Sequence, residues 1–440
     1  MRTEPRQHAT WNRRRFLGAA GFGVGVSVGA ATLSSCDLAG RPANNAGSVG
    51  ALTEDSLPAP LAGEIVPFDD VYQAGVATDS QAQLCLVGFD LKKGTSRDDL
   101  VNLMSLWTDD ARHLCTGEAP LGSLEPELAA IPANLTITCG WGEGAFRVLG
   151  ASESKPQWLR PVAKFDRDEL SDDWGQTDLV LQICADDAGT ATHAMRHMVR
   201  AGADYATVAW LQQGFSNAHG AKRPGDTPRN LFGQKDGTVN PRQPEEYDAQ
   251  VWIGADGLGN EEKRPWLEGS TAMVVRRIRM NVDTWEQLDR ASRENAIGRT
   301  LGSGAPLSNP EGDEFESVNP KAVDKYGLPM VDPNSHVARA LPPRGKPEQM
   351  LRRRPYSYNL PPTPADAKEG QLSNVGLIFI CFQKDPTRQF EPIQKRLDES
   401  DLLNTWITHI GSSVYWVPPG TGGDGGSGTY WGQGLVEAVS

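Results

Sequence analysis

The sequence has few cysteines, six among 440 residues, and none of them belongs to a closely spaced C-x-x-C pair. Zinc knuckles need such pairs, and disulfide frameworks need a denser, even set. Five cysteines follow position 36, and four of these lie inside apolar runs typical of strands, namely Cys85, Cys139, Cys184 and Cys381. A thiol in such a run usually serves as a small buried hydrophobe. We therefore expect free cysteines in the core.

The sequence also has fewer basic than acidic residues. The chain has 43 Lys and Arg against 56 Asp and Glu, which gives a net charge of −13 with histidine neutral. Residues 1–35 hold five Arg and one Glu, so the chain from position 36 onward carries −17. A surface of this sign, with no basic stripe, repels nucleic acid and anionic lipid. It also repels anionic substrates at neutral pH, which favours a mildly acidic working pH.

The N-terminus lacks a hydrophobic run of full membrane-spanning length. The uncharged segment Gly18–Leu33 is short and rich in Gly, Ala and Val, and it follows Asn12-Arg13-Arg14-Arg15-Phe16-Leu17. This combination is typical of a twin-arginine export signal, which we assign to residues 1–35. A single membrane-spanning helix is the weaker alternative. Because twin-arginine export usually carries folded proteins, often with a cofactor already in place, the signal hints at a prosthetic group.

The end of this signal leaves two cleavage routes open. Leu33-Ser34-Ser35-Cys36 resembles a lipoprotein box, in which Cys36 would carry a lipid anchor. A plain signal-peptidase cut nearby explains the segment equally well. Either route predicts an extracytoplasmic protein, located in the periplasm, on the cell surface or in the medium.

Composition and periodicity divide the remaining chain into a flexible linker over 36–63 and two halves, 64–240 and 241–440. In the first half the patterns predict strands over 83–91, 134–140, 177–185 and 206–214, with helices over 97–116 and 188–200. The order β-α-β-β-α-β defines a ferredoxin-like unit.

The second half repeats part of this order. Its patterns predict a strand over 270–280, a helix near 283–291, a strand over 376–383 and a helix over about 388–399. A long insertion, 298–367, is dense in Pro, Arg, Asn and Gly, and such a loop in a compact domain usually carries function. We expect an α+β fold in which two ferredoxin-like halves pack as a sandwich or barrel.

Three short segments carry residues suited to chemistry. The first is Asn230-Leu231-Phe232-Gly233-Gln234-Lys235-Asp236-Gly237-Thr238-Val239-Asn240-Pro241, the second runs from Ser335-His336-Val337 to Pro342-Pro343-Arg344, and the third is Met350-Leu351-Arg352-Arg353-Arg354-Pro355-Tyr356-Ser357-Tyr358. Taken singly, an Asp-Gly pair predicts a turn, a lone histidine is usually structural, and a run of arginines usually forms a solvated face.

Taken together and in this order, the segments resemble the A-type dye-decolorizing peroxidases. They are similar to that family's G-x-x-D-G-T signature, its S-H-[IV] proximal ligand and its L-R-R-x-[FY]-x-Y string. Further matches begin at Tyr72, Ile297, Gly304 and Gly376, so the resemblance covers residues 72–386. It implies a dimeric α/β barrel-like haem peroxidase fold, built from two ferredoxin-like βαββαβ halves, with one haem b per chain.

The resemblance also implies roles for individual residues. His336 would bind the iron, and Asp236 would act as the distal acid and base that moves the peroxide proton. An arginine of the third segment would stabilise peroxide cleavage; counting back from Tyr358 selects Arg353, with Arg354 as the other register. The full set implied to contact the haem is Gly237, Thr238, Val239, His336, Arg344, Arg353, Leu377 and Phe379.

Hydrogen peroxide and an aromatic donor, dye-like or phenolic, are the implied substrates. Bulky donors cannot enter a closed pocket, so electrons are expected to travel through surface aromatic residues, of which no single Trp or Tyr is selected. One alternative within the family is a deferrochelatase, which releases iron from haem in iron uptake and would work beside permease partners. Another is a haem carrier without turnover, which would not need Asp236 and Arg353. A homodimer is left open.

Overall fold

The computed structural model describes residues 63–223, 225–254, 258–368, 371–422 and 429–440. The predicted export signal, Cys36 and the predicted linker up to residue 62 lie outside the described residues. Within these ranges, no helix combines the length and the apolar character needed to cross a membrane.

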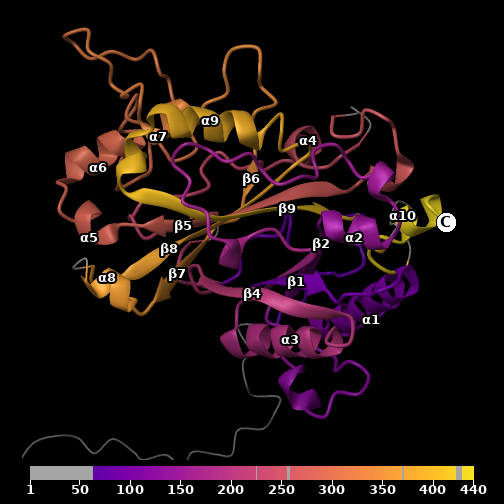
Figure 1. Cartoon of the computed structure of the whole chain (residues 1–440). Helices are drawn as coiled ribbons and strands as arrows, with labels where there is room; N and C mark the ends of the chain where they lie inside the picture. The colour runs from indigo at the N-terminus through magenta and orange to yellow at the C-terminus, as the bar shows by residue number, and fades with distance from the viewer. Residues whose placement is uncertain (1–62, 224, 255–257, 369–370, 423–428) are drawn as a thin grey trace, which may run out of the picture. The chain divides into compact units, whose positions relative to one another are not determined.

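The N-terminal half folds as the predicted ferredoxin-like unit. Its four antiparallel strands lie in the order β2-β3-β1-β4, and two helices cover their outer face (Figure 1). The helix α1 begins at a capping box made by Ser96 and Asp99, and α3 begins at the cap of Asp187. The elements are β1 (Gln83–Leu91), α1 (Arg97–Cys115), β2 (Thr136–Trp141), α2 (Glu143–Val148), β3 (Leu179–Ala185), α3 (Ala188–Ala201) and β4 (Ala206–Phe215).

The C-terminal half repeats this topology, with strands in the order β9-β5-β8-β7. One helix was expected near 283–291, but two short ones form because Asn281 and Asp289 each cap a separate helix. The strands β7 and β9 were not predicted. The elements are α4 (Pro244–Gln250), β5 (Thr271–Met280), α5 (Val282–Trp285), α6 (Arg290–Ile297), α7 (His336–Ala340), β6 (Arg352–Arg353), β7 (Tyr356–Leu360), α8 (Pro364–Lys368), β8 (Asn374–Gln383), α9 (Phe390–Ser400), β9 (Ile407–Val417) and α10 (Gln433–Ala438).

The two halves join edge to edge into a closed antiparallel barrel. β2 pairs with β9 at Trp141 and Trp416, and β4 pairs with β7 at Phe215 and Ser357. Alternate side chains of the strands fill the interior, where Tyr356 and other residues of both halves form one apolar cluster. The predicted α+β class and the pairing of two ferredoxin-like halves are therefore confirmed.

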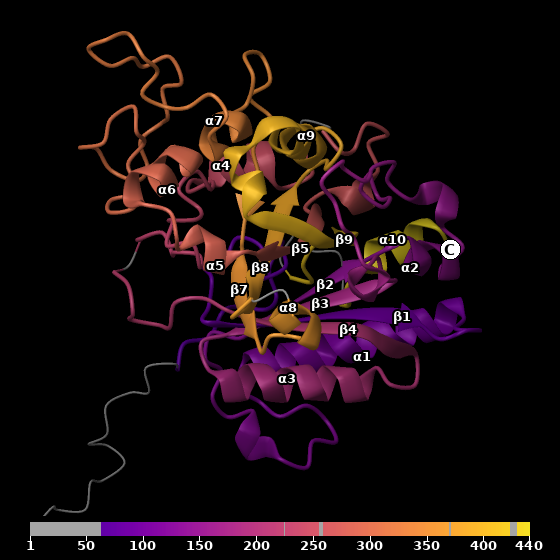
Figure 2. The ribbon, with the colours of Figure 1, turned by 60° about the vertical axis from the view of Figure 1, so that its left-hand side comes forward.

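Helices cover the barrel on opposite sides. Figure 1 and Figure 2 show α1 and α3 beside β1 and β4, whereas α7 and α9 lie over β5 and β8. The described cysteines, Cys85, Cys115, Cys139, Cys184 and Cys381, are all buried and unpaired. The core placement predicted for four of them is confirmed, and Cys115, for which no placement was predicted, is buried as well.

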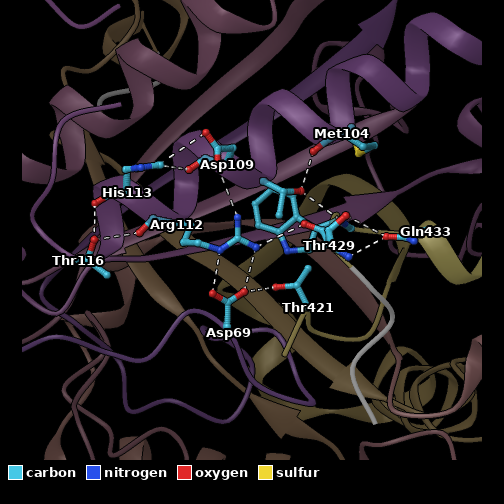
Figure 3. A network of polar contacts seen from close by, with 11 residues as sticks. Asp69, Met104, Asp109, Arg112, His113, Thr116, Thr421, Thr429 and Gln433 are labelled. Carbon is cyan, nitrogen blue, oxygen red and sulfur yellow. Dashed lines mark hydrogen bonds and ion pairs between the residues drawn. The ribbon is translucent and has the colours of Figure 1, made fainter. Parts of the chain in front are cut away.

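A polar network joins the segment before β1 to the last residues of the chain (Figure 3). Arg112 on α1 binds both carboxylate oxygens of Asp69, at 2.8 and 3.0 Å, and also donates to the carbonyl of Thr429 at 3.4 Å. Thr421 donates to Asp69 at 2.7 Å. Hydrogen bonding to Arg112 lowers the pKa of the Asp69 carboxyl. This network holds the C-terminal segment against α1, on the side of the fold away from α7 and α9.

Candidate functional site

A deep cavity lies between the outer face of the C-terminal sheet and the helices α7 and α9. The space between its lining side chains, open solvent at the mouth included, is about 1550 Å³. Ile278 and Met280 of β5 and Leu377 and Phe379 of β8 form an apolar wall. His336, at the start of α7, belongs to the facing side. Its lining is therefore suited to a mostly apolar ligand.

Strand alternation decides which arginine enters this cavity. Arg353 pairs with Cys381, on the same face of β8 as Phe379, whereas Arg352 pairs with Phe382, which points into the barrel. Because a shift of one residue moves a side chain to the other face, Arg354 lies with Arg352. Arg354 is fully buried and donates to the carbonyl of Thr78 and to Gln81. Arg353 alone of the three arginines lines the cavity.

Asp236 and Arg353 meet in the cavity, although 117 positions separate them in the chain. Oδ1 of Asp236 lies 3.1 Å from a guanidinium nitrogen of Arg353. The pair is held by Asn240, whose amide accepts from the backbone N–H of Arg353 at 2.9 Å and donates to its carbonyl at 2.8 Å. Gly237, with φ of +126°, makes the turn between Asp236 and Asn240. The Asp-Gly turn therefore positions the carboxylate beside the cation.

Opposite this pair, a buried carboxylate orients His336. Nδ1 of His336 donates to Oδ2 of Asp401 at 2.6 Å, and the other oxygen of Asp401 accepts from the N–H of Leu403 at 2.9 Å. The Asp401 side chain is fully buried. This arrangement fixes the tautomer and leaves Nε2 of His336 available to the cavity, with no hydrogen-bond partner among the described residues.

The electrostatics of His336 connect the two sides of the cavity. Burial lowers the pKa of its imidazole, but the Asp401 carboxylate more than offsets burial, so the pKa is raised overall. Arg353 opposes this rise and Asp236 adds to it. All three side chains line the cavity, so the imidazole and the Asp236–Arg353 pair face a common space.

A second histidine, His409 of β9, also lines the cavity. Burial and the Arg276 cation hold the pKa of His409 well below its ordinary value, so the imidazole is neutral. Arg276 is fully buried and paired with the buried Asp168 of the N-terminal half. Nε2 of His409 lies 3.2 Å from the Gln394 amide. Nδ1 of His409 accepts from Arg276 at 3.5 Å, so both ring nitrogens are engaged, and His336 is the cavity imidazole left free to bind a metal.

Two positively charged side chains, Lys235 and Arg299, also line the cavity. Arg299 is buried. Its burial and, as the next largest cause, the positive charge of Arg353 lower the pKa of its guanidinium group. Its guanidinium donates to the carbonyls of Gly304 and Glu314, both at 2.8 Å. Lys235 pairs with Oε1 of Glu314 at 2.8 Å. These groups could approach the acidic edge of a ligand.

The remaining predicted residues divide into two groups. Thr238, Val239, Leu377 and Phe379 line the cavity, whereas Gly237 is not part of its described lining. Arg344 is exposed and lies outside the set of described lining residues, so its implied contact with the haem gains no support from its position.

Sequence reasoning assigned no role to several residues of this site. Asn240 belongs to the first segment, and its position just after the Asp-Gly turn is a local signal that could have identified it as a site residue. Asp401 carries no local signal beyond capping a short turn, since its partner lies 65 positions away. His409 carries no local motif, and a β-bulge in the pairing of β5 with β9, beside Ile278, accompanies its place in the cavity wall.

The side chains present fit a haem. Nε2 of His336 is free toward the cavity, and apolar side chains line much of the space between it and the Asp236–Arg353 pair. Oδ1 of Asp236 is buried and, although close to Arg353, receives no hydrogen bond from any described residue. A single imidazole on one side and an unsatisfied carboxylate with a cation on the other suit an iron porphyrin that binds a small oxygen ligand.

Family comparisons agree with this geometry. Two profiles, described as Dyp-type peroxidase, N-terminal and C-terminal, match residues 73–216 and 227–422. The dye-decolorizing peroxidase of Thermobifida fusca is 33% identical over 437 residues, with 97% of each chain covered. A deferrochelatase of Escherichia coli is 32% identical over 369 residues, covering 80% of this chain and 84% of that protein.

Solved structures give the same result. A DyP-type peroxidase from Cellulomonas bogoriensis superposes with a TM-score of 0.78 at 40% identity, covering 86% of this chain and 100% of the other. DtpA from Streptomyces lividans, solved as an oxyferrous complex, gives 0.77 at 36% identity, covering 86% and 98%. Both likenesses extend over nearly the whole described part of this chain.

Proposed function

The chain belongs to the Dyp-type peroxidase family and is a haem peroxidase, and from this premise we propose which residues perform the reaction and on which substrates. We propose that it reduces hydrogen peroxide and oxidises dye-like or phenolic donors, with His336 as the iron ligand, Asp236 as the distal acid and base, and Arg353 as its cationic partner. The observation that carries this proposal is the 3.1 Å approach of Asp236 to Arg353 in the cavity that His336 also lines.

On the distal side, two side chains handle peroxide. Asp236 takes the proton from one peroxide oxygen and returns it to the other, which then leaves as water. Arg353 is permanently cationic and stabilises the negative charge that grows on the departing oxygen. Haem, when bound, would supply the electrons that this cleavage requires and would regain them from the donor. Leu377 and Phe379 exclude water from the face where the reaction occurs.

On the proximal side, Asp401 sets the properties of His336. A carboxylate that accepts from Nδ1 raises the basicity of Nε2 and keeps the ring in one orientation. The 2.6 Å contact is short, as expected for a charge-assisted hydrogen bond. His336 therefore donates strongly to a bound iron.

The test of the function is the absorption spectrum of the purified holoenzyme. A Soret band is expected, which one equivalent of hydrogen peroxide should displace and an aromatic donor should restore. A band that peroxide leaves unchanged would contradict peroxidase turnover and leave a haem carrier as the function.

We expect Asp401→Asn to retain haem while slowing the reaction with peroxide by roughly 10–100-fold, because the anionic partner of His336 is lost. The ferric–ferrous midpoint potential should rise, since the ligand donates less. Stopped-flow mixing with peroxide and a redox titration measure the two effects. Asp398→Asn, nearby on α9 and bound to backbone N–H groups of Asp166 and Arg167, is the matched control. Unchanged potential and rate in Asp401→Asn would show that the carboxylate has no influence on the iron.

The names of several relatives favour a second candidate function, deferrochelatase. In that reaction iron leaves the haem and two protons take its place on the pyrrole nitrogens. Incubation of the enzyme with haem under reducing conditions, followed by fluorescence detection of the metal-free porphyrin, separates this activity from peroxidase turnover.

We also propose that the protein belongs to the A-type subgroup and is exported by the twin-arginine route. The support is the Arg13-Arg14-Arg15 run before an uncharged segment. Fractionation of cells that produce the full chain, compared with an R13K/R14K/R15K variant, tests export. Retention of both forms in the cytoplasm would exclude it.

A further inference from the structure

Gln234 is a buried polar residue of the cavity that the proposed function does not use. Its side chain is 3% exposed and lines the cavity. Nε2 of its amide is buried, and no described residue supplies a hydrogen-bond acceptor for it. An unsatisfied buried donor costs roughly 1–3 kcal/mol, so this amide is expected to meet a ligand.

The local backbone turns Gln234 and Asp236 the same way. Lys235 forms an antiparallel bridge with Arg229, and the carbonyl of Gln234 accepts from the N–H of Asn230 at 2.9 Å. In such an extended segment, residues two apart point to one side. Lys235 between them is engaged by Glu314 at 2.8 Å. The amide of Gln234 and the carboxylate of Asp236 are thus presented together to the cavity.

The two unsatisfied atoms are complementary. Nε2 of Gln234 can only donate, and Oδ1 of Asp236, as a carboxylate oxygen, can only accept. A small hydroxylic molecule can satisfy both at once, because it accepts through an oxygen lone pair and donates its O–H. Water and hydrogen peroxide have this property, whereas a haem propionate lacks the donor.

We propose that Gln234 positions hydrogen peroxide for Asp236, by donating a hydrogen bond to one peroxide oxygen so that the peroxide proton points at Oδ1 of the carboxylate. This inference rests on the proposed distal role of Asp236. The amide is neutral, so it orients the substrate without changing the charge balance between Asp236 and Arg353. No proton is transferred to or from Gln234.

The test uses the ferric holoenzyme and fluoride, an anion that binds haem iron and accepts hydrogen bonds from distal donors. Gln234→Met keeps the length of the side chain and removes the amide. We expect its fluoride dissociation constant to rise, and its second-order rate constant with peroxide to fall, each by about tenfold, the effect of one lost hydrogen bond. The haem content should be unchanged. Gln234→Glu replaces the donor with an acceptor and should weaken fluoride binding further.

Gln157→Leu, an exposed glutamine of a separate cleft, is the control and should match the parent protein. Fluoride affinity and peroxide rate within twofold of the parent in both Gln234 variants would overturn the inference. So would a loss of haem with fluoride affinity intact, because the amide would then serve the porphyrin. Asp236→Asn is measured alongside: if it too leaves fluoride and peroxide unaffected, the distal assignment itself fails, whereas an effect confined to Asp236→Asn refutes only the role of Gln234.

Discussion

Exchange of Asp236 for Asn is expected to slow peroxide-driven oxidation by on the order of a hundredfold or more while leaving the haem spectrum in place. The amide keeps the shape of the side chain but cannot take a proton from peroxide. Folding should be preserved, because the Asn side-chain carbonyl can keep the 3.1 Å approach of Arg353, and of the contacts that described residues make with the Asp236 carboxylate only the long 3.4 Å hydrogen bond from Asn230, to the other oxygen, is lost. Stopped-flow mixing of the ferric enzyme with peroxide measures the rate directly.

Asp248→Asn, on the exposed surface of α4, serves as the control and should react like the parent protein. The variant Arg353→Leu tests whether the two residues act as one unit. If they do, the double variant should be little slower than either single variant, since effects within one catalytic unit are not additive. Full activity of Asp236→Asn would exclude the carboxylate from the proton transfer.

Replacement of His336 with Ala is expected to remove the iron ligand and with it most of the bound haem. Nε2 of His336 is the free imidazole nitrogen of the cavity, because His409 is engaged on both sides by Arg276 and Gln394. The ratio of Soret to protein absorbance measures haem content. It should fall severalfold, and the haem that remains should lose the spectrum of a histidine-ligated iron.

The control for this experiment is His219→Ala, which changes an exposed histidine after β4 and should keep full haem content. Addition of free imidazole to the His336→Ala protein should restore part of the original spectrum, since the cavity would accept the missing ring. A His336→Ala variant with unaltered haem content and spectrum would place the ligand elsewhere, with His409 as the next imidazole to examine.

Much of the secondary structure followed from local pattern. The strand over 83–91 was predicted at its observed bounds, and the helix from Arg97 was predicted to within one residue of its end. Both have strong signals, a continuous apolar run in one case and a capping box with helical periodicity in the other. By contrast β9 was missed, because Gly411-Ser412-Ser413 at its centre has low strand propensity. Its pairing with β5 through ten residue pairs overrides that preference.

The arginine run shows where local reasoning stops. From sequence, Arg353 and Arg354 were alternatives separated only by a count from Tyr358. The pairing of Arg353 with Cys381 on β8 places the Arg353 guanidinium in the cavity. Arg352 and Arg354 therefore lie on the opposite face of the strand, where Arg354 donates hydrogen bonds to Thr78 and Gln81. A register across strands is a property of the sheet, which no single segment contains.

From its sequence alone, this protein can be recognised as a two-half α+β chain with one candidate imidazole, one candidate carboxylate and a short choice of arginines. Those features are encoded in contiguous residues, where periodicity, capping and motif spacing are local. Only the tertiary structure decided that Asp401 orients His336, that Asn240 holds Arg353 beside Asp236, and that Gln234 faces the same space. These contacts join residues from 65 to 113 positions apart or arise from the packing of a loop against the barrel, so they exist only once the two sheets have closed.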